Sequence, residues 1–185
     1  MNARLPVLAL NGIGLWGLSA VLVAAVAIQL VSGELPCPLS LLQRIAMAAV
    51  GFGLLLNVRF GPKPAHYGLV ILAALYGLAA ATRQVFLHIA PGSGAYGSPL
   101  LGLHLYTWCA IIFLAAILVC ALLLLWEGQF EEDGPVPTPA PRWVQLGAVA
   151  LMAVTAVVAV LAFAECGPTE CADDPTGYWL FGGGT

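Results

Sequence analysis

The sequence predicts an all-α integral membrane protein. Hydrophobic residues make up 61% of its 185 residues and charged residues only 8%, and the mean hydropathy is +0.97, which excludes a soluble globular domain. A helix needs about 20 apolar residues to cross roughly 30 Å of hydrocarbon, and the chain contains several such stretches between polar or Pro- and Gly-rich breaks. We expect a single membrane domain over residues 1–185, with five spans near 8–32, 37–57, 67–88, 102–126 and 143–164.

The first and the fifth stretches each have an alternative interpretation. The first could be a cleaved signal peptide, but it is longer than an ordinary signal core and only one basic residue, Arg4, precedes it. The fifth could lie in the membrane interface, but between positions 144 and 164 its polar side chains are only Gln145 and Thr155. Because the fifth stretch also has no charged face, a span is favoured there.

Basic residues predict the orientation. Under the five-span topology the loop residues Arg4, Arg59, Lys63 and Arg142 all fall on one side. Since Lys and Arg are retained in the cytoplasm, we expect a cytoplasmic N-terminus and a tail over residues 165–185 on the outer side of the membrane. The net charge of −3 gives no basic surface typical of nucleic-acid binding, so partners are expected in or beside the bilayer.

A thiol and an arginine share the start of the second span. Cys37 precedes Pro38, a typical first residue of a helix, and a helix N-terminus favours a thiolate at Cys37. Arg44 follows seven residues later, about 10 Å deeper on nearly the same face. There it could hold the oxygen of a bound carbonyl compound and stabilise negative charge on it.

The other cysteines divide by depth. Cys109 and Cys120 lie eleven residues apart in one span, separated by about 16 Å of rise, so both are expected to be structural thiols. Cys166 and Cys171 lie on the outer side, and the turn between them could join their sulfurs. Two interpretations stay open: a structural disulfide, or a shuttle pair that exchanges electrons with an external dithiol protein and with Cys37. The tail has no His, so no metal site is expected.

Residues 36–44, Pro-Cys-Pro-Leu-Ser-Leu-Leu-Gln-Arg, resemble the Cys-Pro-Leu-Cys-Leu-Leu-Gln-Arg motif of the DsbB family, the bacterial inner-membrane quinone-linked thiol oxidases. Arg83-Gln84-Val85 and the segment Gly102 to Trp108 also resemble that family, and the likeness covers about residues 10–126. The resemblance implies a four-helix transmembrane bundle of DsbB type, to which this chain adds a fifth C-terminal transmembrane helix.

The resemblance also implies a redox cycle in the bacterial inner membrane. An outer cysteine pair takes electrons from a DsbA-like periplasmic dithiol protein and passes them to a pair at the second span, which reduces ubiquinone or menaquinone. Cys37 matches the first cysteine of the second pair, and Arg44 matches the arginine at the quinone ring. The other residues expected near the quinone are Gln43, Arg83, His88 and His104. Arg83 could instead be a snorkelling side chain, and each histidine could simply be hydrogen-bonded.

Two departures from the family pattern bear on function. Ser40 occupies the position of the quinone-facing cysteine, and a hydroxyl forms no disulfide with Cys37. The loop 90–101, where well-known family members carry the outer pair, contains no cysteine, so we expect Cys166 and Cys171 to replace it.

The predicted function is disulfide-bond formation linked to a quinone, in a form that is trapped or inactive because of Ser40. Ser40 would be either a deliberate Cys-to-Ser trap, which the odd count of five cysteines favours, or a natural variant. The alternative is a catalytically silent quinone-binding or scaffold subunit of the membrane. A small transporter is weaker, because the polar residues of the membrane centre are few: Asn11, Arg44 and Arg83.

Overall fold

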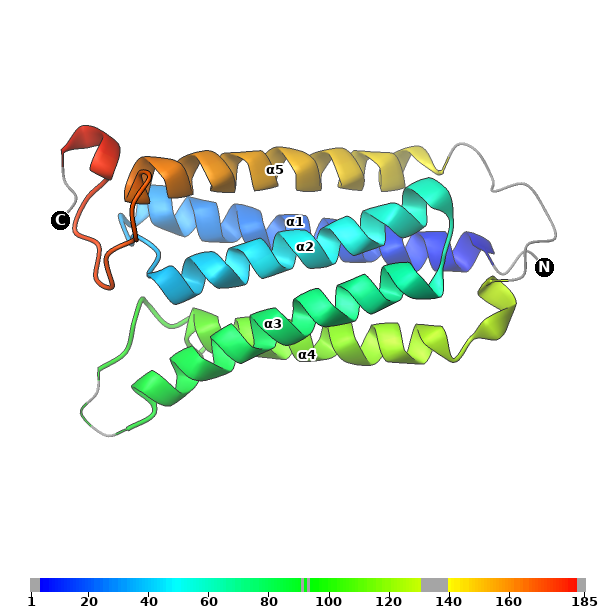
Figure 1. Cartoon of the computed structure of the whole chain (residues 1–185), viewed down its shortest axis with the longest axis horizontal. Coiled ribbons are helices and arrows are strands. Elements are labelled where there is room, and N and C mark those ends of the chain that lie inside the picture. The colour runs from blue at the N-terminus through cyan, green and yellow to red at the C-terminus, as the bar shows by residue number, and fades with distance from the viewer. Residues whose placement is uncertain (1–3, 91, 93, 131–139, 183–185) are drawn as a thin grey trace.

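The structure is a computed structural model, and it describes residues 4–90, 92, 94–130 and 140–182. Five long helices run up and down along one axis (Figure 1): α1 (Arg4–Val31), α2 (Pro38–Phe60), α3 (Pro64–His88), α4 (Leu105–Leu124) and α5 (Arg142–Cys166). All five are long and apolar enough to cross a membrane. Within the described residues no strand is formed beyond one isolated bridge, so the predicted all-α membrane class is confirmed.

Proline and glycine set the helix boundaries. Pro38 and Pro64 each occupy the first turn of a helix, where a missing N–H costs no hydrogen bond. Gly61 ends α2 with a φ of 84°, and Gly167 ends α5 with a φ of 64°, a region that favours glycine. As a result α5 extends through Cys166, and Glu165, expected in the tail, lies in its last turn.

Helix α2 is central to the bundle and contacts each of the other four long helices. The pair α3 and α4 lies on one side of α2, and α1 and α5 lie on the other (Figure 1). Glycines permit the close approaches: a Cβ at Gly51 would overlap Leu151 of α5, and a Cβ at Gly77 would overlap Phe113 of α4. The fifth helix is therefore packed into the bundle as one of its core elements.

A buried polar cluster fixes the end of the bundle that holds the helix α2–α3 turn. Asn57 is fully buried; its Oδ1 accepts from the backbone N–H of Lys63 at 3.2 Å and lies 3.0 Å from His66 Nδ1. Asn11 donates to Tyr67, which donates to Gln129 at 2.9 Å. These buried polar side chains form hydrogen bonds with one another, so a structural role accounts for their burial.

Candidate functional site

Cys37 lies at the opposite end of the bundle, at the N-cap of α2. Its backbone is extended, Pro38 begins the helix, and its side chain is only 7% exposed. The Cys37 sulfur is 3.1 Å from the Ser40 hydroxyl oxygen, because positions three apart share the first turn. Cys37 and Ser40 are therefore paired in space as two redox cysteines would be, but one partner is a hydroxyl.

Helix α3 supplies a second contact to this sulfur. The side-chain amide of Gln84 donates to Cys37 Sγ at 3.3 Å, and its carbonyl accepts from Gln43 Nε2 at 2.7 Å. Gln43 and Gln84 are each only 2% exposed. The glutamine pair therefore fixes a hydrogen-bond donor on the Cys37 sulfur and sets the polar surroundings of this thiol.

A cavity of about 370 Å³ lies beside this cluster and extends into the membrane-spanning part of the bundle. Its polar groups include Ser40, Gln43, Arg44 and Gln84. The rest of its wall is mainly apolar and includes Val21, Ala25, Ile28, Met47, Leu105, Tyr106, Trp108, Cys109 and Ile112. A mostly apolar cavity with a few converging polar groups is typical of a small-molecule site.

Arg44 connects this cavity to the fifth helix. Its guanidinium donates to Gln29 Oε1 at 2.6 Å and to the carbonyl of Ala25 at 3.2 Å. The amide of Gln29 in turn donates to Glu165 Oε2 at 3.3 Å and to the Tyr178 hydroxyl at 3.2 Å. Neither Gln29 nor Glu165 was predicted from the sequence, although a glutamine and a carboxylate at the outer ends of apolar spans are a signal of a functional site.

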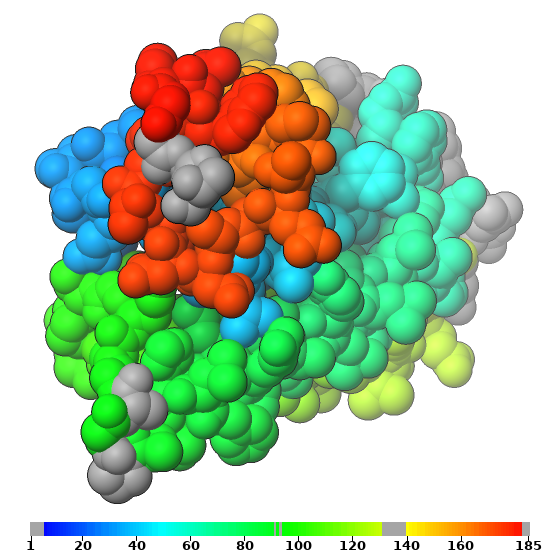
Figure 2. Space-filling view, turned by 60° about the vertical axis from the view of Figure 1, so that its left-hand side comes forward, coloured from blue at the N-terminus to red at the C-terminus, as the bar shows by residue number. Residues whose placement is uncertain are grey.

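Three chain segments gather on the same end face (Figure 2): the tail, the α1–α2 connection and the α3–α4 connection. The two connections are joined directly, since Glu34 accepts hydrogen bonds from Ser98 and the Tyr96 hydroxyl donates to the carbonyl of Leu35 at 2.7 Å. Burial raises the pKa of Tyr96 to about 12, so this hydroxyl keeps its proton at neutral pH. The segment that precedes Cys37 is thus held by the α3–α4 connection.

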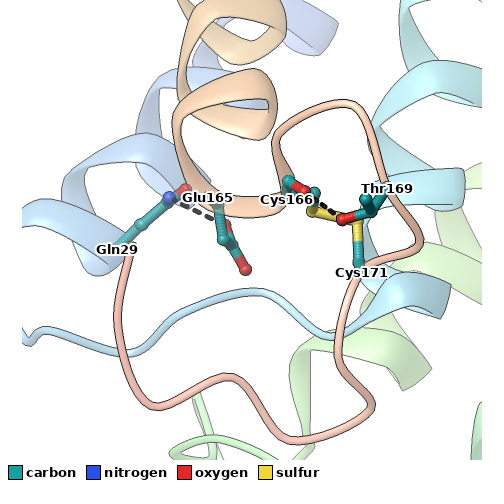
Figure 3. The surroundings of a disulfide bond; sticks show 5 residues. All are labelled: Gln29, Glu165, Cys166, Thr169 and Cys171. Carbon is teal, nitrogen blue, oxygen red and sulfur yellow. Dashed lines mark hydrogen bonds between the residues drawn. A yellow bond between two sulfur atoms is a disulfide. The ribbon is translucent and has the colours of Figure 1, made fainter. Parts of the chain in front are cut away.

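Cys166 and Cys171 form a disulfide in the tail (Figure 3). The Thr169 hydroxyl donates to the carbonyl of Cys166 at 3.1 Å and supports the turn between the two cysteines. The formation of the disulfide agrees with both interpretations, a structural disulfide and a shuttle pair. Of the free cysteines, Cys120 is buried as expected, whereas Cys109 is only partly buried and lines the cavity.

The other residues that the sequence predicts near a quinone differ in their distance from the cavity. Arg83 is exposed and does not line the cavity. His88 and His104 both stack on Tyr106, a cavity residue, with ring centroids 5.6 and 5.3 Å apart. His88 Nδ1 lies 3.2 Å from the carbonyl of Gly94, and His104 Nδ1 is buried with no hydrogen-bond partner among the described residues. The described part of the chain holds no cluster of metal ligands.

Comparisons with known proteins bear directly on this site. The family described as Disulfide bond formation protein DsbB matches residues 8–96, which contain Cys37, Ser40, Gln43, Arg44 and Gln84. The resemblance to the DsbB family is confirmed. The DsbB-like region holds the cysteine–serine pair, both glutamines and the arginine, whereas Glu165, Cys166 and Cys171 lie outside the match.

Curated relatives carry the same family name. Disulfide bond formation protein B of Nitrosomonas eutropha is 38% identical over 119 residues, 60% of this chain and 63% of the relative. Disulfide bond formation protein B of Xanthomonas euvesicatoria is 37% identical over 84 residues, 43% of this chain and 49% of the relative. The chain thus spans about half to under two thirds of the relatives it matches. No solved structure matches it.

Proposed function

We propose that this protein acts in disulfide-bond formation at the outer face of the bacterial inner membrane, linked to ubiquinone or menaquinone. Its soluble substrate would be a DsbA-like periplasmic dithiol protein, its N-terminus would be cytoplasmic and its tail periplasmic. The observation that supports this most directly is the placement of Cys37, which contacts Ser40 and Gln84, two residues that line an apolar cavity with Arg44 in its wall. The DsbB-like match over residues 8–96 points to the same chemistry.

The cavity residues fit a quinone. A quinone has two carbonyl acceptors on a flat ring and an apolar tail, and the cavity offers the donors of Arg44 and Gln43 within a largely apolar wall. The wall is formed mainly by residues of α1, α2 and α4, so an apolar tail could extend toward lipid. When bound, a quinone would supply a two-electron acceptor. Arg44 would hold a carbonyl oxygen and stabilise negative charge on it.

The thiol chemistry is carried by the outer disulfide and Cys37. A thiolate of the dithiol substrate attacks one sulfur of the Cys166–Cys171 bond, forms a mixed disulfide and releases the other cysteine as a thiolate. The second substrate thiol then attacks the substrate sulfur of this mixed disulfide and releases the remaining cysteine of the pair as a thiolate. The substrate therefore leaves as a disulfide, and two electrons remain on Cys166 and Cys171. Cys37 can form a mixed disulfide, but Ser40 cannot resolve it. Electrons therefore stop at the outer pair.

Stoichiometry tests this proposal. In liposomes containing ubiquinone, the protein should oxidise about one equivalent of a reduced thioredoxin-fold dithiol protein per chain and reduce no quinone. Ser40→Cys should convert this single event into continuous dithiol oxidation with matching loss of quinone absorbance. Ser40→Ala is the matched control and should stay at one equivalent. Sustained quinone reduction by the unaltered protein would contradict the proposal.

A second candidate function follows from the 3.1 Å pair of Cys37 and Ser40, which forms no disulfide. The protein could bind quinone as a catalytically silent or scaffold subunit. Mixed-disulfide trapping separates the two functions: after incubation with the dithiol protein, a covalent adduct at Cys37 or at the outer pair supports exchange. If every thiol stays inert while quinone still binds, the silent role is correct.

A further inference from the structure

Among the residues that the structure describes, no anion is in direct contact with the positive charge of Arg44. Its side chain is 9% exposed, and its described hydrogen-bond acceptors, Gln29 Oε1 and the carbonyl of Ala25, are both uncharged. Arginine stays protonated in proteins, and a buried charge is costly unless an opposite charge lies near. The network around Arg44 should therefore contain a counter-charge beyond these two acceptors.

Gln29 links Arg44 to the carboxyl group of Glu165. Its carbonyl accepts from Arg44 at 2.6 Å, and its amide donates to Glu165 Oε2 at 3.3 Å, so one side chain faces a donor at one end and an acceptor at the other. Figure 3 shows Gln29 of α1 and Glu165 of α5 pointing toward one another. Gln29 is 2% exposed and Glu165 is 5% exposed, so water screens this bridge weakly.

Glu165 also differs from the other titratable neighbours of Arg44. The groups that interact electrostatically with the guanidinium are Glu165, Cys109, Tyr178 and Cys37. Thiols and phenols are ordinarily neutral near pH 7, whereas a carboxyl is ordinarily ionised. Glu165 Oε1 has no hydrogen-bond partner among the described residues, so the carboxylate is turned to Arg44's network through Oε2.

We propose that Glu165 is the counter-charge of Arg44, a positioning residue that acts through Gln29 to limit how strongly the cavity attracts negative charge on a bound quinone. This inference rests on the proposed quinone site. While Glu165 is ionised, it offsets part of the field that Arg44 exerts in the cavity. The residue lies outside the DsbB-like match and is brought to the site by α5.

Two probes of nearly equal shape test the proposal. One is 2,3-dimethyl-1,4-naphthoquinone, which is neutral, and the other is 2-hydroxy-3-methyl-1,4-naphthoquinone, which is an anion at about pH 8. Neither has an open ring position that a thiol could attack. Binding to the full-length protein in micelles is measured by quenching of Trp108, which lines the cavity, with Trp108→Phe as the blank.

Glu165→Gln should raise the affinity for the anion relative to the neutral probe by roughly three- to tenfold, because Arg44 loses its counter-charge. Glu170→Gln is the matched control; it removes an exposed carboxylate from the same end of the molecule and should leave the ratio unchanged. In the double variant Gln29→Glu, Glu165→Gln the carboxylate moves next to Arg44, and the ratio should return to the starting value or fall below it.

The outcomes separate this inference from the proposed function. If both probes bind and Glu165→Gln leaves their ratio unchanged, the counter-charge role is wrong while the quinone site stands. If neither probe binds the unaltered protein, the quinone site is wrong and the inference falls with it. If Glu165→Gln does not fold, the double variant Gln29→Glu, Glu165→Gln provides the test. An affinity ratio of anionic to neutral probe above that of the unaltered protein then overturns the proposal.

Discussion

The side-chain amide of Gln84 on α3 donates a hydrogen bond to the sulfur of Cys37 at the start of α2, at 3.3 Å. This contact joins two segments that are 47 residues apart in the chain. It places the thiol in a buried polar setting instead of a merely apolar one, and Gln43 fixes the orientation of the amide by donating to its oxygen. Reactivity at Cys37 should therefore depend on α3.

Gln84→Leu should slow alkylation of Cys37 by iodoacetamide by about tenfold at fixed pH, because a thiolate loses a hydrogen-bond donor. Mass spectrometry of the Cys37 peptide over time gives the rate. Arg83→Ala, at the exposed neighbouring position, serves as the control and should not change it. Equal rates in Gln84→Leu and the unaltered protein would show that the amide has no influence on the thiol.

Arg44→Leu should weaken binding of the neutral naphthoquinone by about tenfold, since the carbonyl loses a charged donor worth about 1.5–3 kcal/mol. Quenching of Trp108 measures the affinity. Arg59→Leu removes an exposed arginine from the opposite end of the same helix and should leave binding intact. Undiminished affinity in Arg44→Leu would exclude Arg44 as a ligand of the carbonyl.

The two span cysteines should respond differently to a cavity ligand. Cys109 lines the cavity, whereas Cys120 is 3% exposed within the core. Methyl methanethiosulfonate should modify Cys109 faster than Cys120, and excess neutral naphthoquinone should slow the reaction of Cys109 at least severalfold. Peptide mass spectrometry follows both sites in one sample, so Cys120 is an internal control. Modification of Cys109 that is indifferent to the ligand would place the quinone elsewhere.

Removal of the outer disulfide distinguishes a shuttle from a structural clip. In a Ser40→Cys background, Cys166→Ser or Cys171→Ser should abolish oxidation of the soluble dithiol protein, because no outer sulfur then accepts its electrons. Cys120→Ser in the same background should retain activity. If the dithiol protein is still oxidised without Cys166, the disulfide only fixes the tail and Cys37 is attacked directly.

Tyr96 predicts a dependence of stability on alkaline pH. Its pKa is raised from an ordinary 10.0 to about 12 by burial, so the folded state holds the phenol proton more tightly than the unfolded state. The stabilisation is complete below about pH 10 and is lost as the pH rises through about 12. Tyr96→Phe should reduce the free energy of unfolding by about 1 kcal/mol at neutral pH through the lost bond to Leu35.

Unfolding in detergent micelles from neutral to strongly alkaline pH gives this difference directly. The gap between the unaltered protein and Tyr96→Phe should be constant up to about pH 10 and then close. Tyr76→Phe, at an exposed tyrosine of α3, provides the comparison and should show no such gap. A gap for Tyr96→Phe that does not change with pH would mean that the hydroxyl is not selectively protonated in the folded protein.

The principal elements were predictable because each depends on local sequence. Five apolar stretches identify the helices, and Cys37 before Pro38 identifies the start of α2. Residues 36–44 were enough to suggest the DsbB family, because that motif is short and contiguous. The spacing of Cys37 and Ser40 within one helical turn also predicts their proximity, which the 3.1 Å contact shows.

What the sequence could not provide is the set of contacts between helices. The sequence does not show that Gln29 contacts Arg44, that Glu165 contacts Gln29, or that Gln84 contacts Cys37. All three contacts cross helix interfaces. Cys109 was expected to be a structural thiol, but the cavity reaches it. Rotation of each helix about its axis decides which side chains face one another, and that rotation depends on packing contacts such as Leu151 against Gly51.

The sequence by itself determined the membrane class, the thiol above an arginine and the hydroxyl that interrupts the cysteine pair, because hydropathy and helical spacing act within a single segment. The tertiary structure decided the surroundings of that arginine: α1 supplies Gln29, which accepts from Arg44, and α5 supplies Glu165, which accepts from Gln29. The physical reason is that a buried charge must be balanced by groups near it in space, and nearness across helices is set by packing.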